Sequence, residues 1–328
     1  MSLSPSLWIL LGTIAAGTAV LSLVGFLGNW WWLFDLASHF RMQYFVLLVF
    51  LAVLFWLGRQ PWAALGAATF SLLNLVLVAA LYFPVKAEPA HQQASYRLLF
   101  ANVLQANQSY EKIRQLIRSS EPDFIVLAET NRDWLQALEG IGENYPYTKS
   151  AAREDNYGIA LFSRFPFEKA EIHTFGETGV PSIVMRLKLD GNGVTLIGTH
   201  PPPPKGPEAT RHRNAQLLAL ADFAAQIPDS TLLCGDLNLS PWSPYFRQVL
   251  QRSGLQNSLR GFGVQSSWPV DRPLFRVPID HCLVSPGVRI QSRELGPAVG
   301  SDHFPVIVDF ALENKRLVEQ HSSSGRAQ

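Results

Sequence analysis

The stretch STLLCGDLNLS, residues 230–240, decides the fold class of this chain. Its apolar run Leu232–Cys234 predicts a buried strand, and Gly235 lets the backbone turn so that Asp236 and Asn238 emerge together at the strand's end. In α/β sheets, ligands bind at the carboxyl ends of strands. A carboxylate and a carboxamide placed there indicate a site for an oxyanion and a metal. The alternative is an Asx turn that only closes the strand.

The chain of 328 residues divides into two parts of very different charge. Residues 1–95 hold three lysines and arginines and two acidic residues, whereas residues 96–312 hold 21 basic and 22 acidic residues. The first part is apolar enough for a membrane domain. The second part is nearly neutral, which gives no support to strong non-specific DNA binding, because that binding needs a basic face.

Three segments without charged residues predict three transmembrane helices, at about 6–28, 43–58 and 61–83. The first and third are long enough to cross a hydrocarbon core of roughly 30 Å. Trp30–Trp32, Trp56 and Trp62 lie near span ends, as interfacial aromatic residues do. The alternative is a helical hairpin buried in a soluble protein. A signal peptide fits poorly, because the start lacks a basic region.

The remaining boundaries follow from composition. Residues 86–95 are small and polar and predict a linker, residues 96–312 predict one globular domain, and residues 313–328 predict a polar tail. Cys234 and Cys282 both lie in apolar strand-like runs, so we expect buried thiols rather than a disulfide.

Polar residues follow or interrupt apolar strand-like runs along the globular domain. Each has a structural alternative: Glu129 as a helix N-terminal charge before 131–138, His200 as a hydrogen-bonded structural histidine, and Arg211–Arg213 as the solvated face of a helix over 208–226. Besides Asp236 and Asn238, the polar positions are Asn102, Glu129, His200, Asp280, His281, Asp302 and His303.

Such a set of residues suits a hard, oxygen-seeking cation, because it is rich in carboxylates and amides. It contains no thiolate ligand and no pair of histidines at the spacing typical of structural zinc. Hard oxygen ligands beside imidazoles favour phosphoryl chemistry, in which a cation neutralises phosphoryl oxygens and a carboxylate activates water.

The order of these motifs resembles the endonuclease/exonuclease/phosphatase superfamily, the DNase I-like proteins. The resemblance covers residues 96–312 and implies an α/β fold, a four-layer sandwich of two mixed β-sheets flanked by helices. Combined with three N-terminal spans and the SPWSPY segment at 240–245, it resembles a bacterial membrane branch of that superfamily. The motifs are FAN (100–102), the strand end at Glu129, YGIALFS (157–163), TH (199–200), GDLN (235–238), IDH (279–281) and GSDH (300–303).

The resemblance implies a metal site and a catalytic group. Glu129 is implied as the main ligand of Mg²⁺, for which Mn²⁺ could substitute, with Asn102 beside it and Asp302 as a further ligand. Asp236 is implied to orient and deprotonate the attacking water, and Asn238 to hold the phosphate.

Four further roles are implied around the phosphate. His303 is implied to contact phosphoryl oxygens or supply a proton, fixed by Asp280 as a carboxylate–imidazole pair. His200 matches the family's second histidine, and Tyr157 is a weaker match. His281 follows Asp280 on the same strand and is expected to face the other side as a structural residue.

We therefore expect a membrane-anchored, Mg²⁺-dependent phosphoesterase that hydrolyses a diester or monoester, with a lipid headgroup or a small phosphoester near the bilayer as substrate. We expect a multi-pass protein of the bacterial inner membrane. An extracytoplasmic catalytic domain is favoured by Arg59 and opposed by Arg41 and Lys86. No obligate protein partner is evident. The alternatives are a metal-dependent nuclease acting on nucleic acid and a non-catalytic binding module on a membrane stalk.

Overall fold

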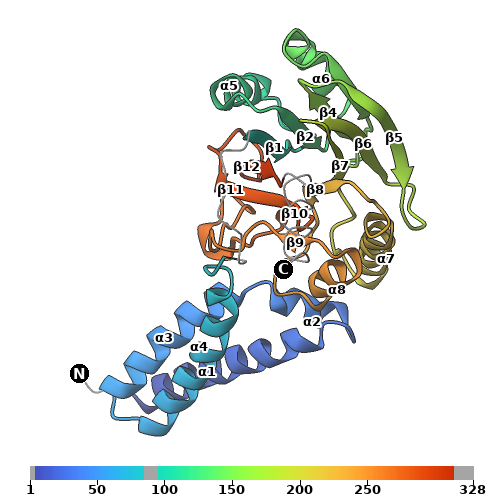
Figure 1. Cartoon of the computed structure of the whole chain (residues 1–328). Coiled ribbons are helices and arrows are strands. Elements are labelled where there is room, and N and C mark those ends of the chain that lie inside the picture. Colours follow the sequence, from blue (N-terminus) through green and yellow to red (C-terminus); the bar gives the residue numbers. More distant parts are fainter. Residues whose placement is uncertain (1–3, 85–94, 314–328) are drawn as a thin grey trace, which may run out of the picture.

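The computed structural model describes residues 4–84 and 95–313, which form a helical bundle and an α/β domain packed against it (Figure 1). The expected linker at 86–95 and the expected tail at 313–328 lie outside these residues except for Ser95 and Glu313.

One sheet of the α/β domain has six strands in the order β11-β12-β1-β2-β4-β3. Strands β1 and β2 run parallel and their other neighbours antiparallel, so the sheet is mixed. The strands are β1 (Tyr96–Asn102), β2 (Phe124–Ala128), β3 (Tyr147–Ala151), β4 (Ile159–Ser163), β11 (Val288–Leu295) and β12 (Val306–Leu312).

The second sheet also has six strands, in the order β5-β6-β7-β8-β10-β9, and it is mixed because β7 and β8 are parallel. The β6–β7 hairpin turns at Asp190 and Gly191, both with positive φ, as the sequence DGNG favours. The strands are β5 (Phe167–Thr174), β6 (Pro181–Leu189), β7 (Asn192–Thr199), β8 (Ser230–Asp236), β9 (Gln256–Asn257) and β10 (Asp280–Val284).

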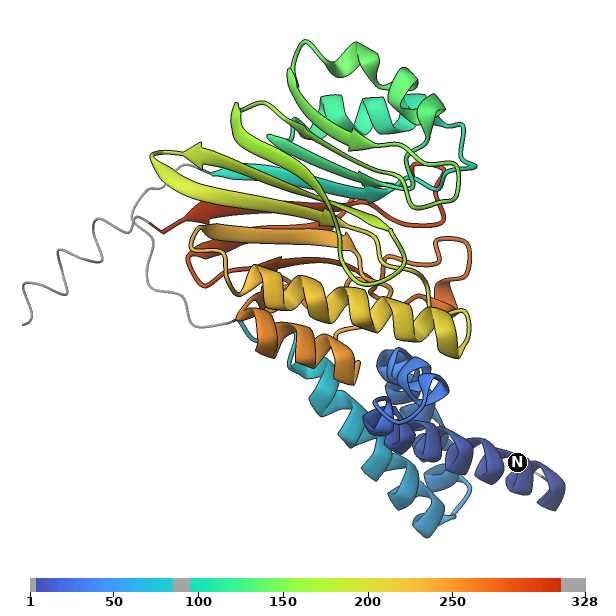
Figure 2. The same cartoon turned by 90° about the vertical axis from the view of Figure 1, so that its right-hand side faces the viewer.

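The two sheets pack face to face, with helices on both outer surfaces (Figure 2). Between the sheets, Phe100 and Leu161 of the first sheet are buried with Met185 and Leu232 of the second. Each such side chain contributes roughly 1.5–3 kcal/mol by leaving water. The expected four-layer α/β sandwich is therefore confirmed. Helices α5 (Tyr110–Ser120) and α6 (Arg132–Ala137) cover the first sheet, and α7 (Pro207–Ala224) and α8 (Pro244–Ser253) cover the second.

The expectation that the cysteines are free thiols is wrong, because Cys234 and Cys282 form a disulfide. Strands β8 and β10 pair antiparallel in a register that sets these two residues directly opposite each other, with their Cα atoms 4.1 Å apart. The two cysteines are 48 residues apart in the sequence, and this spacing does not reveal that they lie opposite each other.

A glycine is required at position 235 for a different reason from the one expected. It lies inside β8 rather than at a turn, and a Cβ at this position would clash with the backbone carbonyl of Thr199 on β7. The glycine therefore permits the close approach of two parallel strands that both end at the site.

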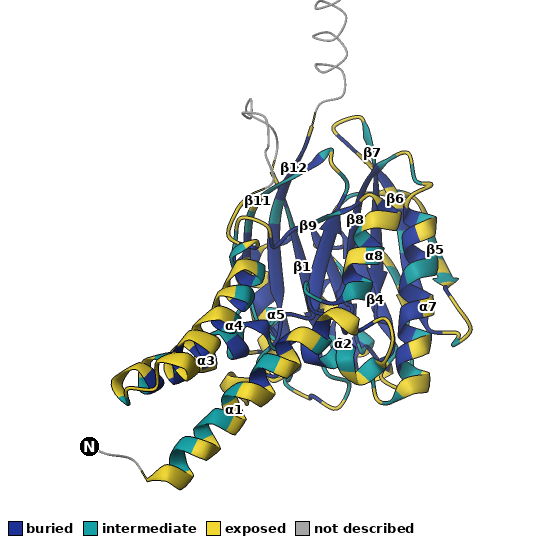
Figure 3. Ribbon diagram, turned by 90° about the horizontal axis from the view of Figure 1, so that it is seen from below, coloured by how far each residue is buried: buried dark blue, intermediate teal, exposed yellow. Residues whose placement is uncertain are grey.

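The N-terminal region contains two helices that are long and apolar enough to cross a membrane, one over Pro5–Leu27 and α4 over Pro61–Ala79. A third span exists only if α2 (Trp32–Ser38) and α3 (Arg41–Leu57), which meet at 65°, are counted as one. Apolar side chains such as Ile9 and Val76 are exposed on the bundle surface, as lipid-facing residues are (Figure 3). The first span comprises α1 (Pro5–Val24) and a short 3₁₀ turn (Gly25–Leu27).

A buried ion pair joins the bundle to the sandwich. Asp35 on α2 accepts a hydrogen bond of 2.6 Å from the Arg213 guanidinium on α7 and another of 2.5 Å from the Ser243 hydroxyl. The solvated face expected for Arg211–Arg213 is thus wrong for Arg213, which is completely buried. Its burial needs a counter-charge, which Asp35 of the N-terminal helical bundle provides.

Further contacts seat the sandwich on the helices. The carbonyl of Leu81, just beyond α4, accepts hydrogen bonds from the amides of Gly261 and Gly263 at 2.8 and 3.1 Å. At the start of α3, the Gln43 amide donates to the carbonyl of Arg276 at 2.7 Å. The α/β domain therefore contacts three of the membrane helices.

Replacing Asp35 by Ala in the full chain should lower the free energy of unfolding by about 3–5 kcal/mol, because it leaves the Arg213 charge buried without a partner. The measurement is thermal unfolding of the detergent-solubilised protein.

Asp222→Ala is the matched control for Asp35→Ala, because Asp222 pairs with Arg252 at 3.1 Å on the surface. Its removal should cost at most about 1 kcal/mol. Equal effects of the two variants would show that the buried pair does not hold the two domains together.

Candidate active site

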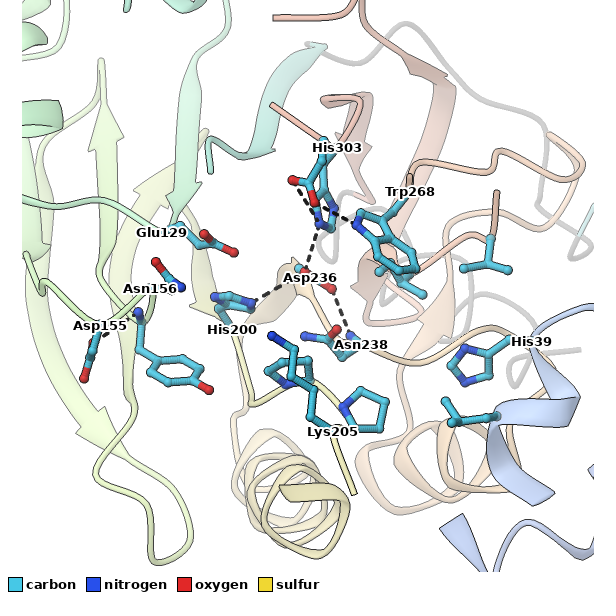
Figure 4. A pocket seen from close by; sticks show the side chains of 17 residues that line it. His39, Glu129, Asp155, Asn156, His200, Lys205, Asp236, Asn238, Trp268 and His303 are labelled. Carbon is cyan, nitrogen blue, oxygen red and sulfur yellow. Dashed lines mark hydrogen bonds and ion pairs between the residues drawn. The ribbon is translucent and has the colours of Figure 1, made fainter. Parts of the chain in front are cut away.

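The polar strand ends of both sheets converge on one pocket of about 370 Å³ (Figure 4). Asn102 and Asp280 lie buried behind its wall. The other seven candidate residues line it: Glu129, Tyr157, His200, Asp236, Asn238, Asp302 and His303.

Asn102 connects the two sheets at this point. Its Nδ2 donates to Glu129 at 2.9 Å and to Asp236 at 3.2 Å, so an amide at the end of β1 stands between carboxylates at the ends of β2 and β8. Glu129 also accepts from the amide of Gln105 at 3.2 Å. Helix α6 is capped by Asn131 instead, so Glu129 does not serve as its N-terminal group.

The backbone is strained beside these carboxylates. Glu129 has φ 62°, Asn238 has φ 51° and Leu104 has φ 58°, a left-handed conformation that costs such residues about 1–3 kcal/mol each. Strained backbone conformations of this kind cluster at functional sites, where they orient a side chain.

Asp236 makes an Asx turn and also faces the pocket. Its Oδ1 accepts from the Asn238 amide at 3.0 Å, while its Oδ2 lies 3.5 Å from His200 Nε2. Burial raises the pKa of Asp236 to about 6, with a further rise from Asp280 that the two histidines His303 and His200 oppose. The Asx turn is therefore present, and Asp236 also lines the pocket; its catalytic role stays a prediction. Asn238 is not extended, and its Nδ2 donates to the carbonyl of Pro201 at 3.1 Å.

His303 and Asp280 form a buried pair, with Nδ1 2.9 Å from a carboxylate oxygen. Burial lowers the pKa of His303, but the charges of Asp280 and Asp236 and the hydrogen bond to Asp280 together raise it to about 10. The two carboxylates therefore favour the protonated form of His303. Its Nε2 lies 3.6 Å from Asp236.

The remaining candidates surround this pair. The Tyr157 ring lies 5.8 Å from the His200 ring, and burial raises the Tyr157 pKa. Asp302 accepts from the Trp268 indole at 2.9 Å and lies 4.0 Å from His303. His281 does not line the pocket, and it contacts the carbonyl of Leu239 at 2.8 Å.

Several pocket residues were missed by sequence reasoning. Three of them, Asp155, Asn156 and Trp268, lie on loops, and the course of these loops cannot be predicted from local sequence patterns. Leu36 and His39 belong to the membrane region. No signal marked His39, because it lies between the first two expected spans, in a segment that also contains Asp35 and Arg41.

Two groups of side chains could hold a metal ion. Potential ligand atoms of Asp236, Asp280 and His303 lie within 4.8 Å of one another. In that group, however, His303 Nδ1 and Asp280 already bond each other. Glu129 instead faces the pocket and, like Asp302, forms no ion pair with a lysine or arginine in residues 4–84 and 95–313. The Glu129 side of the pocket fits a hard cation better.

A sequence profile of the Endonuclease/Exonuclease/phosphatase family matches residues 94–303. The chain belongs to this family. It is accordingly a metal-dependent hydrolase of phosphoester bonds. A search among curated proteins found no match.

Solved structures of the family share the fold. A Bacteroides vulgatus endonuclease/exonuclease/phosphatase is 20% identical with a TM-score of 0.57, covering 67% of this chain and 100% of its own. D. rerio TDP2 complexed with a single strand DNA product is 16% identical with a TM-score of 0.57, covering 66% and 99%. Sphingomyelinase C from Streptomyces griseocarneus is 18% identical with a TM-score of 0.51, covering 67% and 100%.

The charge state of His303 gives a prediction for the metal-free protein. Its folded pKa of about 10 exceeds the ordinary histidine pKa of 6.5, so its protonation stabilises the fold fully below pH 6.5. That contribution is lost as the pH rises towards 10. Asp280→Asn should lower the folded pKa of His303 and narrow this window.

The measurement is the pH titration of histidine Cε1 signals by NMR in the full chain with a chelator present, with His303→Gln to assign the signal. A wild-type His303 that titrates near 6.5 would contradict the role of Asp280.

Proposed function

We propose that the chain is a membrane-anchored, Mg²⁺-dependent phosphoesterase that hydrolyses a phosphodiester or phosphomonoester in line. The observation that carries this proposal is the meeting of Glu129, Asn102 and Asp236 at one point of a pocket that also holds His200 and His303. A carboxylate with a pKa of about 6 beside an imidazolium is the acid–base pair that such hydrolysis needs.

The proposed roles follow from charge and contact. Asp236 takes the proton of the attacking water, because its carboxylate is buried beside two histidines. His303, held by Asp280, donates to the phosphoryl oxygens. Asn238, fixed by the Pro201 carbonyl, holds the phosphate.

Glu129, Asn102 and Asp302 would hold the cation, which when bound supplies charge neutralisation to the phosphoryl oxygens. Mg²⁺ suits this oxygen-rich set, and Mn²⁺ is the expected substitute. His200 and Tyr157 border the same space, where they confine the phosphate.

Asp236→Asn should lower hydrolysis of bis-p-nitrophenyl phosphate by about 10²–10⁴-fold, because the base is lost while the shape is kept. The assay uses the full chain in detergent with Mg²⁺. Asp222→Asn is the control, since it makes the same change at an exposed carboxylate on α7.

Glu129→Gln extends the same test to the metal. It should weaken Mg²⁺ binding by at least about tenfold in a calorimetric titration. Wild-type protein that is inactive on nucleic acid, lipid and small phosphoesters alike would favour the non-catalytic binding module instead.

We also propose that the α/β domain lies outside the cytoplasm, on the outer side of the bacterial inner membrane. The Cys234–Cys282 disulfide supports this side, because disulfides persist in oxidising compartments.

This placement gives a thiol prediction. Protein purified under denaturing, non-reducing conditions after alkylation in cells should show no free thiols, and both cysteines should react after reduction. Labelling of both cysteines before reduction would place the domain in the cytoplasm. The readout is mass spectrometry of the alkylated peptides.

A further inference from the structure

The membrane helix α2 forms one wall of the active-site pocket. Leu36 and His39 line the same cavity as Glu129 and Asp236. Figure 4 places Glu129, Asn156 and Asp155 on one side and Trp268 and His39 on the other, next to the ribbon of the membrane domain. Besides these polar groups, the lining includes the apolar side chains of Leu36, Val277 and Ile279 and the Trp268 ring.

His39 contributes a polar group that the protein leaves unused. Its side chain is only 5% exposed, and its Nε2 has no hydrogen-bond partner among the described residues. A buried polar atom without a partner costs free energy. His39 also lines the pocket, which places its imidazole next to a ligand bound there.

This wall lies at the depth of the membrane surface. Trp30 and Trp31, just before α2, are 79% and 49% exposed, as aromatic residues at a bilayer interface are. Leu274 and Phe275 of the α/β domain are 80% and 60% exposed. They precede Arg276, whose carbonyl binds Gln43 at the start of α3, so they lie at the same level.

The wall is fixed in place. Asp35, on the same helix as Leu36, is held by Arg213, and Arg213 also donates to the Asn238 carbonyl at 2.9 Å. Helix α2 closes one side of the pocket, so a polymer that extends from the site in both directions would be obstructed there. A lipid needs only one entrance, from the bilayer.

We propose that α2 is part of the substrate site and that the substrate is a phosphoester lipid, with its phosphate at Asp236, its headgroup against His39 and its acyl chains towards the bilayer past Leu36. This inference rests on the proposed function and names its substrate class. His39 and Leu36 are then specificity-determining residues.

The reaction is a hydrolysis without any redox step. The oxygen of water bonds to phosphorus, the bond from phosphorus to the leaving oxygen breaks, and the leaving oxygen takes a proton. Lys205, which also lines the pocket, adds a positive charge for the phosphate.

The test uses the full chain in vesicles of phosphatidylethanolamine and phosphatidylglycerol with Mg²⁺. Two soluble diesters serve as comparison: bis-p-nitrophenyl phosphate, and a short-chain phosphatidylglycerol below its micelle concentration. Lipid products are measured by mass spectrometry. His39→Ala and Leu36→Gln should each lower the ratio of vesicle-lipid to bis-p-nitrophenyl phosphate turnover by at least about tenfold, the size of one lost contact.

Two further variants separate a substrate contact from a structural role. His39→Gln keeps a side-chain donor and should recover part of the lipid turnover through a lower KM. Leu33→Gln changes an exposed residue of the same helix that does not line the pocket, and it should leave the ratio unchanged.

Each outcome decides. Wild-type protein that hydrolyses the soluble diesters but no vesicle lipid overturns the lipid proposal and leaves the phosphoesterase intact. An equal loss on all substrates in His39→Ala, without recovery in His39→Gln, assigns His39 a structural role and also overturns it. Wild-type protein inactive on every substrate overturns the proposed function itself.

Discussion

The buried pair of Asp35 and Arg213 is the interaction on which the rest of this structure depends. Two charges leave water together, and neither has another partner of opposite charge among the described residues that could replace the first. Because Arg213 also donates to the Asn238 carbonyl, one guanidinium connects helix α2 to the part of the pocket lined by Asn238. The Asp35–Arg213 contact helps to fix α2, which forms one wall of the pocket. Through Arg213, the same contact helps to position Asn238.

The pocket concentrates unfavourable terms that the surrounding fold offsets. Asp236 and Asp280 are buried carboxylates close enough to raise the pKa of Asp236, and the imidazolium of His303 lies between them. Glu129 and Asn238 hold left-handed backbone conformations. Buried charges and strained backbone persist only where the surrounding structure, here two packed sheets, fixes the strand ends. Buried charges with shifted pKa values are also typical of sites of acid–base chemistry.

The polar strand ends could be predicted because each follows a local apolar run, such as the residues before Glu129 or Asp236. The sandwich followed from the resemblance in the order of the motifs, since the runs alone indicate only an α/β fold. The sequence did not predict β11, whose charged residues Arg289 and Arg293 interrupt any apolar alternation. It also missed the disulfide, which depends on the register of two strands, and the burial of Arg213, which depends on a partner in another domain. The metal and catalytic roles of the individual pocket residues stay predictions.

The ion pair between Asp35 and Arg213 also limits which segments could replace the N-terminal helices. N-terminal helices that served only as a tether could be exchanged for any other hydrophobic segment without loss of stability or activity. Here, a foreign anchor would remove the counter-ion of Arg213 and one side of the pocket together. Exchanging the N-terminal helices should therefore disturb the packing of Arg213 and the shape of the pocket at the same time.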